Sequence, residues 1–388
     1  MEEQQEELPL YVSDPVINKE GIGGITTYVS YSLKGSKLQN PLNRRYRDFD
    51  ALRRKLIERW PGVFIPKLPH KKKIGNKQKE VVEIRIEMIN RFLKKLCNID
   101  YLYGSDEVEL FLQESSNVPK TLDNIKENTY EELLKKYASV FTDYDDNFDT
   151  LAGKKDQESF RLKLGQNYPR LKAFRKLVYQ EKIRFQDVQK NYLAILNLIT
   201  LYEKDVMLNY TGDEEKLVFM NSKNVDLLKN MANTQEKVIN PYDRLYAAIT
   251  EDYLTTEAMI EALDGLKGLQ ETYNKLTRNL TSTNVQLNDL QAGKTNIKTL
   301  FKFKGKEENI NNLMIQKEKL ERDIEHLGQI IKIVTFNMQK EIQNFQTTSL
   351  DNYYAQLARV EEDTETNSSI FDELWDTVVR DKNISEYN

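Results

Sequence analysis

The first part of the chain alternates short strand-like runs with helical stretches. Residues 9–33 alternate apolar and polar positions and are rich in Tyr, Val, Ile and Thr, with a glycine-rich break at 21–24. This pattern predicts two β-strands joined by a hairpin loop. A helical stretch follows at residues 51–60. From residue 80 apolar side chains recur at steps of three and four, which predicts a second helix, and residues 107–112 predict a short closing helix.

From about residue 154 the pattern is almost entirely helical. Three series of apolar residues at alternating steps of three and four cover residues 171–206, 242–280 and 310–360, the second with a phase shift near Gly265. Each predicted helix has about 50 residues or more, which at 1.5 Å per residue is about 75 Å. A thin rod of three such helices has little core of its own, so we expect it to pair with another copy.

Breaks and bends are also predicted within this helical part. The breaks are expected at residues 209–213 and 292–305. Pro169 and Pro241 each remove a backbone hydrogen bond, and we expect them to bend the helices and curve the rod.

An amphipathic segment lies between the two parts. Residues 130–141 place their large apolar side chains on one helical face, with two lysines beside it and three aspartates after it. The sequence leaves two interpretations open: this face lies in a membrane interface, or it packs between the two parts of the chain and connects them.

Composition narrows the class of protein. The chain has 388 residues, more than one compact core usually fills, and 30% of them are charged. It contains no apolar run near 18 residues, and its first seven residues are acidic. These features indicate a soluble cytosolic protein. The single cysteine, Cys97, lies in an apolar helical run and is expected to be a buried hydrophobic side chain.

The charge is unevenly distributed. The net charge is −4, yet residues 41–100 contain 17 Lys and Arg against 7 Asp and Glu. A basic region in an acidic protein indicates a specific anionic surface, either nucleic acid or membrane. Within it, Arg44, Arg45 and Tyr46 suit the capture of a phosphorylated ring, because Arg pairs bidentately with phosphate and a flat aromatic side chain supports a ring face. The alternative is a surface Arg pair beside a core tyrosine.

A proline-spaced segment follows. Residues 61–73 favour an extended polyproline conformation that ends in Lys71, Lys72 and Lys73. Such an arm brings a lysine cluster to one place. Together with the Arg-Arg-Tyr run it fits a compact headgroup better than a ladder of nucleic-acid phosphates, so no nucleic-acid partner is expected.

Nothing in the sequence predicts catalysis. There are two histidines, no cluster of metal-ligand type and no nucleotide-binding loop. We expect no enzyme activity, no metal and no cofactor.

Three motifs in order resemble the phox-homology (PX) domain. They are Arg-Arg-Tyr-x-x-Phe from residue 44, Ile-Pro-x-x-Pro-x-Lys from residue 65, and Ile-Arg-x-x-x-Ile-x-x-Phe-Leu from residue 84. The resemblance covers about residues 5–115. It implies a fold of three antiparallel strands and helices that binds phosphoinositides.

The resemblance also implies roles for individual residues. Arg45 would hold the 3-phosphate, Tyr46 would stack under the inositol ring, Lys71 would meet the 1-phosphate, and Arg85 would bond the 4- and 5-hydroxyls. The chain departs from the pattern at Lys67, where the family often has a second proline, and in its three consecutive lysines. The additional headgroup contacts to be considered are Arg44, Lys72 and Lys73, and either of the two lysines could replace Lys71.

The helical part, placed after a PX domain, resembles the BAR domain of sorting nexins. The implied fold class is an α+β PX domain followed by an elongated all-α BAR coiled coil of three helices. The expected boundaries are 1–115 for PX, 116–153 for a linker with the amphipathic helix, and 154–388 for BAR. In that family the loop between the second and third helices lies at the tip. The tip lysines expected to contact membrane are Lys294, Lys298, Lys302, Lys304 and Lys306.

The resemblance implies an endosomal sorting nexin. It would bind phosphatidylinositol 3-phosphate, act peripherally on the cytosolic face of early endosomes, and sense or induce curvature for tubular cargo sorting by a recycling, retrograde or autophagy-related route. The implied partners are an anionic endosomal membrane, a second copy or another sorting nexin in a dimer, and a retromer-like coat. The alternative is a PX-targeted coiled-coil scaffold or tether that recruits partner proteins without remodelling membrane.

Overall fold

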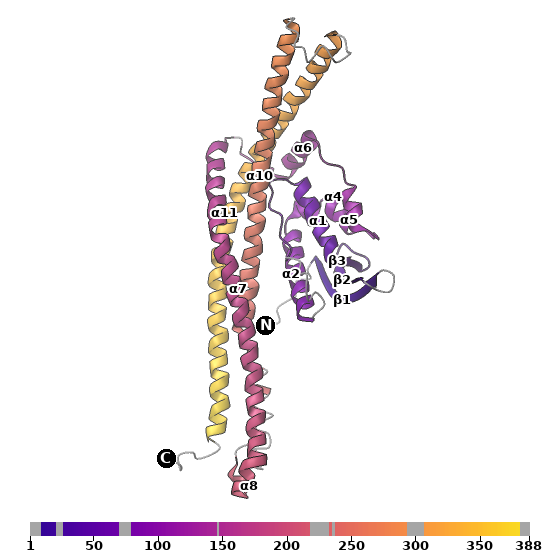
Figure 1. The fold of residues 1–388 in the computed structure, drawn as a ribbon. Helices are drawn as coiled ribbons and strands as arrows, with labels where there is room; N and C mark the ends of the chain where they lie inside the picture. Colours follow the sequence, from indigo (N-terminus) through magenta and orange to yellow (C-terminus); the bar gives the residue numbers. More distant parts are fainter. Residues whose placement is uncertain are drawn as a thin grey trace. The chain divides into compact units, whose positions relative to one another are not determined.

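The computed structural model describes residues 9–20, 26–69, 79–145, 147–217, 233–234, 237–292 and 306–380. The chain forms two compact units. One comprises Met1–Gly165 with Leu254–Asn344, and the other Gln166–Tyr253 with Phe345–Asn388. The boundaries between them fall inside long helices (Figure 1).

The first unit contains a three-stranded antiparallel sheet. Its strands are β1 (Leu10–Glu20), β2 (Thr26–Gly35) and β3 (Leu42–Arg45), in that order across the sheet. A bulge between Ser13 and Val16 interrupts the β1–β2 register, and Asp14 has a φ of 47° there. Aspartate tolerates this left-handed conformation better than most residues do. The predicted hairpin loop at 21–24 lies outside the described residues.

The sheet is followed by helices α1 (Tyr46–Arg59), α2 (Lys79–Cys97), α3 (Asp100–Tyr103), α4 (Asp106–Phe111) and α5 (Val118–Asp123) (Figure 1). Helix α2 packs on β1 and α1 on β3, while α4 and α5 pack on α1. Tyr31, Phe49 and Phe92 form a fully buried core. Cys97 is buried as expected, and burial raises the pKa of its thiol to about 11, so the thiol stays protonated.

The amphipathic segment forms helix α6 (Tyr130–Val140), which packs against the end of α1. A capping box starts it: the Thr129 hydroxyl accepts from the Glu132 N–H at 3.2 Å, and the Thr129 N–H donates to the Glu132 carboxylate at 2.8 Å. Tyr137 is fully buried, stacks on Trp60 at 5.7 Å and donates to the Pro61 carbonyl at 2.9 Å. Of the two interpretations of this helix, the structure shows the packed one, because its apolar face is buried against protein.

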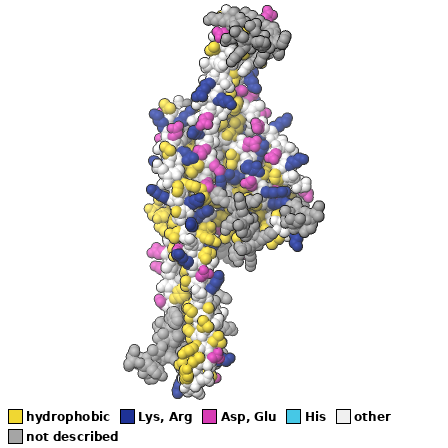
Figure 2. All heavy atoms as spheres, in the orientation of Figure 1, with side chains coloured by type: hydrophobic (Ala, Val, Ile, Leu, Met, Phe, Trp, Pro, Cys, Tyr) yellow, Lys and Arg dark blue, Asp and Glu magenta, His cyan; other side chains and the backbone are white. Residues whose placement is uncertain are grey.

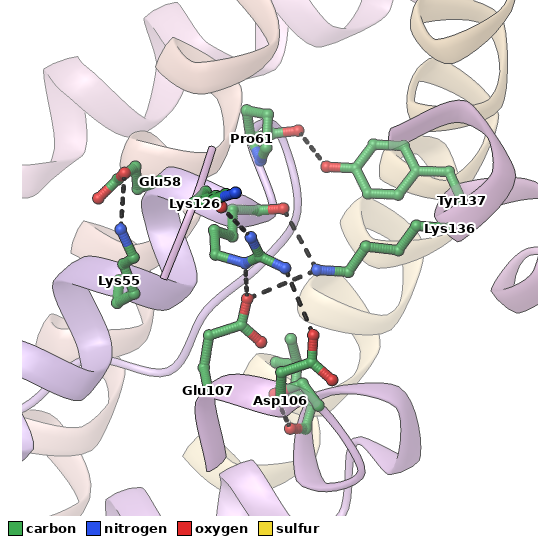
Figure 3. A network of polar contacts seen from close by, with 11 residues as sticks. Lys55, Glu58, Pro61, Asp106, Glu107, Lys126, Lys136 and Tyr137 are labelled. Atoms are coloured by element: carbon green, nitrogen blue, oxygen red, sulfur yellow. Dashed lines mark hydrogen bonds and ion pairs between the residues drawn. The ribbon is translucent and has the colours of Figure 1, made fainter. Parts of the chain in front are cut away.

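A buried polar network holds α6 in place (Figure 3). The carboxylate of Glu107, fully buried on α4, accepts from the guanidinium of Arg59 on α1. The Lys136 ammonium lies 3.6 Å from the same carboxylate and 3.6 Å from the centre of the Trp60 ring. Burial acts to raise the pKa of Glu107, but the two cations and a backbone N–H outweigh it and lower the pKa. The carboxylate therefore stays ionised between its two partners.

The three long helices are α7 (Thr150–Tyr202), α10 (Pro241–Gln291) and α11 (Lys306–Arg380). In the first unit α7 bonds to the other two helices. The Arg161 guanidinium donates to both Asp264 oxygens at 2.8 and 3.0 Å, and the Gln157 amide donates to the Thr335 carbonyl at 2.7 Å.

The loop after α1 fits closely against α10 and α11. Gly62 has a φ of 80°, and a Cβ there would lie 2.8 Å from Val334. A Cβ on Gly265 would lie 2.9 Å from the Gly62 nitrogen. Only glycine permits this approach at both positions. The phase shift predicted near Gly265 therefore coincides with a packing contact.

The second unit contains the remaining helical segments. The Tyr179 and Tyr246 rings pack at 5.2 Å, the Tyr192 and Phe371 rings at 6.1 Å, and the Asn367 amide bonds both backbone groups of Ile239. After α7 come a π-helical turn η2 (Glu203–Met207), α8 (Leu208–Thr211) and η3 (Glu214–Lys216), with Gly212 at a φ of 62°. This break is where the sequence predicts one.

The proline prediction needs one correction. Pro241 does not interrupt a helix but is the first residue of α10, where its missing N–H would have no intrahelical acceptor. Pro169 does lie inside α7, which continues through it. The predicted fold class, a three-stranded antiparallel sheet with helices followed by long helices, is confirmed.

Candidate functional site

Side chains alternate between the two faces along strand β3, so Arg44 and Arg45 point to opposite faces of the sheet. Arg44 lies opposite Tyr31 of β2 and is 2% exposed. Its guanidinium donates to the carbonyls of Phe111 and Gln113, the latter at 2.7 Å. Burial lowers the pKa of Arg44, with Asp48 opposing that shift. These bonds commit Arg44 to tying β3 to the end of α4, so its geometry favours a supporting role.

Arg45 points to the other face of the strand. It lies opposite Ser30 of β2, and its guanidinium carbon is 3.4 Å from the centre of the Tyr28 ring. Its N–H donates to the Asp48 carboxylate at 2.8 Å, which starts α1 earlier than residue 51. A half-buried guanidinium against an aromatic ring is held in orientation with part of its surface open to a ligand.

Tyr46 is the first residue of α1. Its hydroxyl donates to the Pro69 carbonyl in the proline-spaced segment. Burial, with the charge of Asp50 as a second cause, raises its pKa to about 12, so the hydroxyl remains a donor at neutral pH. The tyrosine thus links the start of α1 to the segment that leads into the lysines.

Arg85 lies on α2 and contacts the ring of Tyr46. It is 8% exposed, and its guanidinium carbon lies 5.6 Å from the centre of the Tyr46 ring. Burial raises the pKa of the neighbouring Tyr31 while Arg85 opposes that shift. Arg85 is therefore not a surface residue beside an apolar stripe but a buried cation next to Tyr46.

The structure brings Arg85 of α2 against the ring of Tyr46 on α1, while Arg45, the preceding residue at the end of β3, lies on Tyr28. Several predicted residues lie outside the described part of the chain: Lys71, Lys72, Lys73, Lys294, Lys298, Lys302 and Lys304. Lys306 begins α11, and its side chain is not described.

Sequence reasoning missed two contributors to the site. Tyr28 lies under Arg45 because it is a diagonal neighbour across the β2–β3 pair, which only the strand register reveals. Arg53, 8% exposed on α1, donates to the Pro66 carbonyl at 2.7 Å. Its spacing of seven residues from Tyr46, which places both on one helical face, was the available signal.

No helix among the described residues combines the length and apolar character needed to cross a membrane. In the same part of the chain no group of three or more His, Cys, Asp or Glu could hold a metal ion.

Comparison with known proteins identifies the class. Residues 34–115 match the family model of the PX domain. The chain is 31% identical to sorting nexin-11 of Bos taurus over 126 residues, which is 31% of this chain and 46% of that protein. It is 35% identical to sorting nexin-30 of Xenopus tropicalis over 112 residues, 26% of this chain and 24% of that protein. The chain thus aligns with less than half the length of these relatives.

The chain therefore contains a PX domain, and long helices follow it. The resemblance to the PX domain is confirmed, and the relatives that match this part of the chain are sorting nexins. Among solved structures, the SNX-BAR Mvp1 tetramer is similar at 17% identity and a TM-score of 0.48, covering 96% of this chain and all of that one.

Proposed function

We propose that this chain is an endosomal sorting nexin that binds phosphatidylinositol 3-phosphate through its PX domain. Arg45 takes the 3-phosphate, Tyr46 supports the inositol ring, and Arg85 bonds the 4- and 5-hydroxyls. Lys71, or Lys72 or Lys73 in its place, meets the 1-phosphate.

One observation carries this proposal: two guanidinium groups from separate elements each lie on a tyrosine ring, Arg45 on Tyr28 and Arg85 on Tyr46, and Tyr46 directly follows Arg45 in the chain. Arg45 and Arg85 are each held by packing against an aromatic ring, at 3.4 and 5.6 Å. Guanidinium groups oriented in this way form bidentate bonds to phosphate and hydroxyl oxygens with little loss of side-chain entropy. The Tyr46–Pro69 bond holds the end of the proline-spaced segment, which precedes the lysines in the sequence, at Tyr46.

The first test is the Arg45→Ala variant. A charge-assisted Arg–phosphate pair contributes about 1.5–3 kcal/mol, and a stranded partner costs more, so affinity should fall roughly tenfold to a thousandfold. Binding to phosphatidylcholine vesicles with and without phosphatidylinositol 3-phosphate measures this. Arg54→Ala is the matched control, because Arg54 is exposed on α1 and pairs with Asp50 at 3.2 Å. Unchanged binding by Arg45→Ala would contradict the site.

We further propose that residues 154–388 form a BAR-type domain, with residues 1–115 as the PX domain and 116–153 as the linker. The described part of α7 exposes large apolar side chains, which Figure 2 shows along the stretch that leads to α8. They suit burial against a second copy or another sorting nexin. Dimerisation and a lysine-rich loop at 294–306 would add points of attachment to an anionic membrane and raise avidity.

Curvature separates this function from the scaffold alternative. A sorting nexin of this kind should convert vesicles containing phosphatidylinositol 3-phosphate into tubules, visible by negative-stain electron microscopy. Vesicles that bind the protein and remain spherical would favour a PX-targeted scaffold or tether that recruits partner proteins.

A further inference from the structure

The extended segment at residues 64–69 is held at both of its ends. At its end, the Pro69 carbonyl accepts from the Tyr46 hydroxyl. Near its start, the carbonyls of Ile65 and Pro66 accept from Arg53 at 3.4 and 2.7 Å. Tyr46 and Arg53 lie two turns apart on one face of α1, so the segment runs along that face. We call residues 64–69 the arm.

A carboxylate from outside the PX fold completes this attachment. Glu261 of α10 accepts from the guanidinium of Arg53 and from the ammonium of Lys67, one bond to each of its two oxygens. Arg53 is 8% exposed, whereas the side chain of Glu261 is 36% exposed. The arm, α1 and this part of α10 belong to the same compact unit.

Two further contacts hold α10 beside the PX fold on either side of Glu261. The Lys95 ammonium donates to the Thr255 hydroxyl of α10 at 2.9 Å. On the other side, Gly265 lies against Gly62 as closely as a glycine permits. Glu261 stands on α10 between these two contacts, so its carboxylate is presented to Arg53 and Lys67 by a helix that cannot easily shift.

We propose that Glu261 is a positioning residue for headgroup binding: it fixes the arm through Arg53 and Lys67, and thereby sets the affinity of the site at Tyr46. This inference rests on the proposed function. Without the carboxylate, the buried Arg53 loses the counter-charge that pairs with it, and Lys67 is released. The arm then samples more conformations, and binding must repay the cost of ordering it.

The Glu261→Gln variant of the full chain tests the inference. Binding to phosphatidylcholine vesicles containing phosphatidylinositol 3-phosphate should weaken about threefold to tenfold, as expected when a ligand must order a loosened segment. Amide hydrogen exchange at residues 64–68 should become faster. Glu271→Gln is the matched control, since Glu271 also lies on α10 but is exposed and pairs with Lys267 at 3.8 Å; it should change neither measurement.

A second substitution separates arm order from general stability. Added to the Glu261→Gln variant, Lys67→Pro fixes φ at the centre of the arm. The double variant should regain much of the affinity that Glu261→Gln loses. If Glu261 contributed only to general stability, Lys67→Pro would not restore vesicle binding. Lys67→Met, which keeps the Arg53–Glu261 pair, should weaken binding in the same direction and to a smaller extent.

The outcomes distinguish this inference from the proposed function. Normal vesicle binding and normal exchange in Glu261→Gln, with binding lost in Arg45→Ala, would overturn the role of Glu261 alone. If the unaltered chain does not bind these vesicles, the proposed function fails. In that case unchanged exchange in Glu261→Gln would overturn the positioning role as well, because the arm's order is measured without lipid.

Discussion

The side chains of two successive residues, Arg44 and Arg45, have opposite surroundings. One is buried and bonded to carbonyls, and the other lies half-buried on an aromatic ring. This follows from the two-residue period of a strand, in which neighbours point to opposite faces. A basic pair in a β-strand therefore points one cation to each face of the sheet. Here bonds to the carbonyls of Phe111 and Gln113 occupy Arg44, and Arg45 stays half-buried on the other face.

Glu107 should be among the residues most important for stability. It is fully buried and lies between two cations, Arg59 and Lys136. Replacing it with Ala should lower the free energy of unfolding by about 3–5 kcal/mol, because the buried Arg59 would keep only the exposed Asp106 carboxylate at 3.5 Å. Urea denaturation measures the change. Glu109→Ala on the exposed side of α4 is the control, and an equal effect there would refute the prediction.

Lys136 should make stability depend on pH in the alkaline range. Burial lowers its pKa to about 8 from its ordinary 10.5, with Glu107 opposing the shift. The unfolded chain therefore binds more protons than the folded one between these two values. The contribution of Lys136 to the unfolding free energy should rise across this window, by at most about 1.4 kcal/mol per pH unit.

The comparison with Lys136→Met isolates this contribution. Tyrosines such as Tyr46, whose pKa is raised, act in the opposite direction at high pH in both proteins. The difference between the two unfolding free energies should therefore shift in favour of the lysine-containing protein from pH 8 upwards. Parallel curves would show that Lys136 keeps an ordinary pKa.

At the scale of elements, helix α6 shows what a periodic pattern leaves undecided. Its apolar face predicts burial, but the same face suits a membrane interface or a protein surface equally well. Trp60 and Tyr101, which cover it, lie far away in sequence. No local signal identifies them as its partners.

The docking of α6 is testable through Tyr137. Tyr137→Ala removes a fully buried ring and should cost about 3–5 kcal/mol of stability. Tyr137→Phe loses the bond to Pro61 alone and should cost about 1 kcal/mol. Thermal and urea unfolding measure both. If Tyr137→Ala kept full stability and instead lost vesicle binding, the membrane interpretation of this helix would return.

Sequence alone predicted the elements well and their contacts less well. Strands β1 and β2, α2 and the break near Gly212 follow from local periodicity and glycine, whereas the third strand was implied only by the resemblance to the PX domain. The Tyr28 contact and the Glu261 pairing could not be predicted, because they depend on strand register and on a helix about 200 residues away. Local rules describe a residue's own element, whereas a site is assembled by tertiary packing.

For the whole molecule, we predict self-association through α7. The exposed apolar side chains form a stripe at helical spacing: Leu177, Val188, Ile195, Leu198 and Tyr202. Replacing Val188 and Ile195 with Asp should convert a dimer into monomers, since charges would be buried in an apolar contact. Sedimentation equilibrium measures the mass. The control is Lys190→Asp, on the same helix with an exposed side chain. A dimer that persists in the double variant would place the contact elsewhere.

The close approach of Gly62 and Gly265 affects how this protein can be recombined with its relatives. The compact unit that contains the PX fold also contains Leu254–Asn344, so its borders fall inside α7, α10 and α11 and not after residue 115. A chimera that joins this PX domain to another set of helices would need a glycine at the position of Gly265 and a carboxylate at the position of Glu261 to keep these contacts. The exchangeable module of this protein is the PX domain together with the helical surface on which it rests.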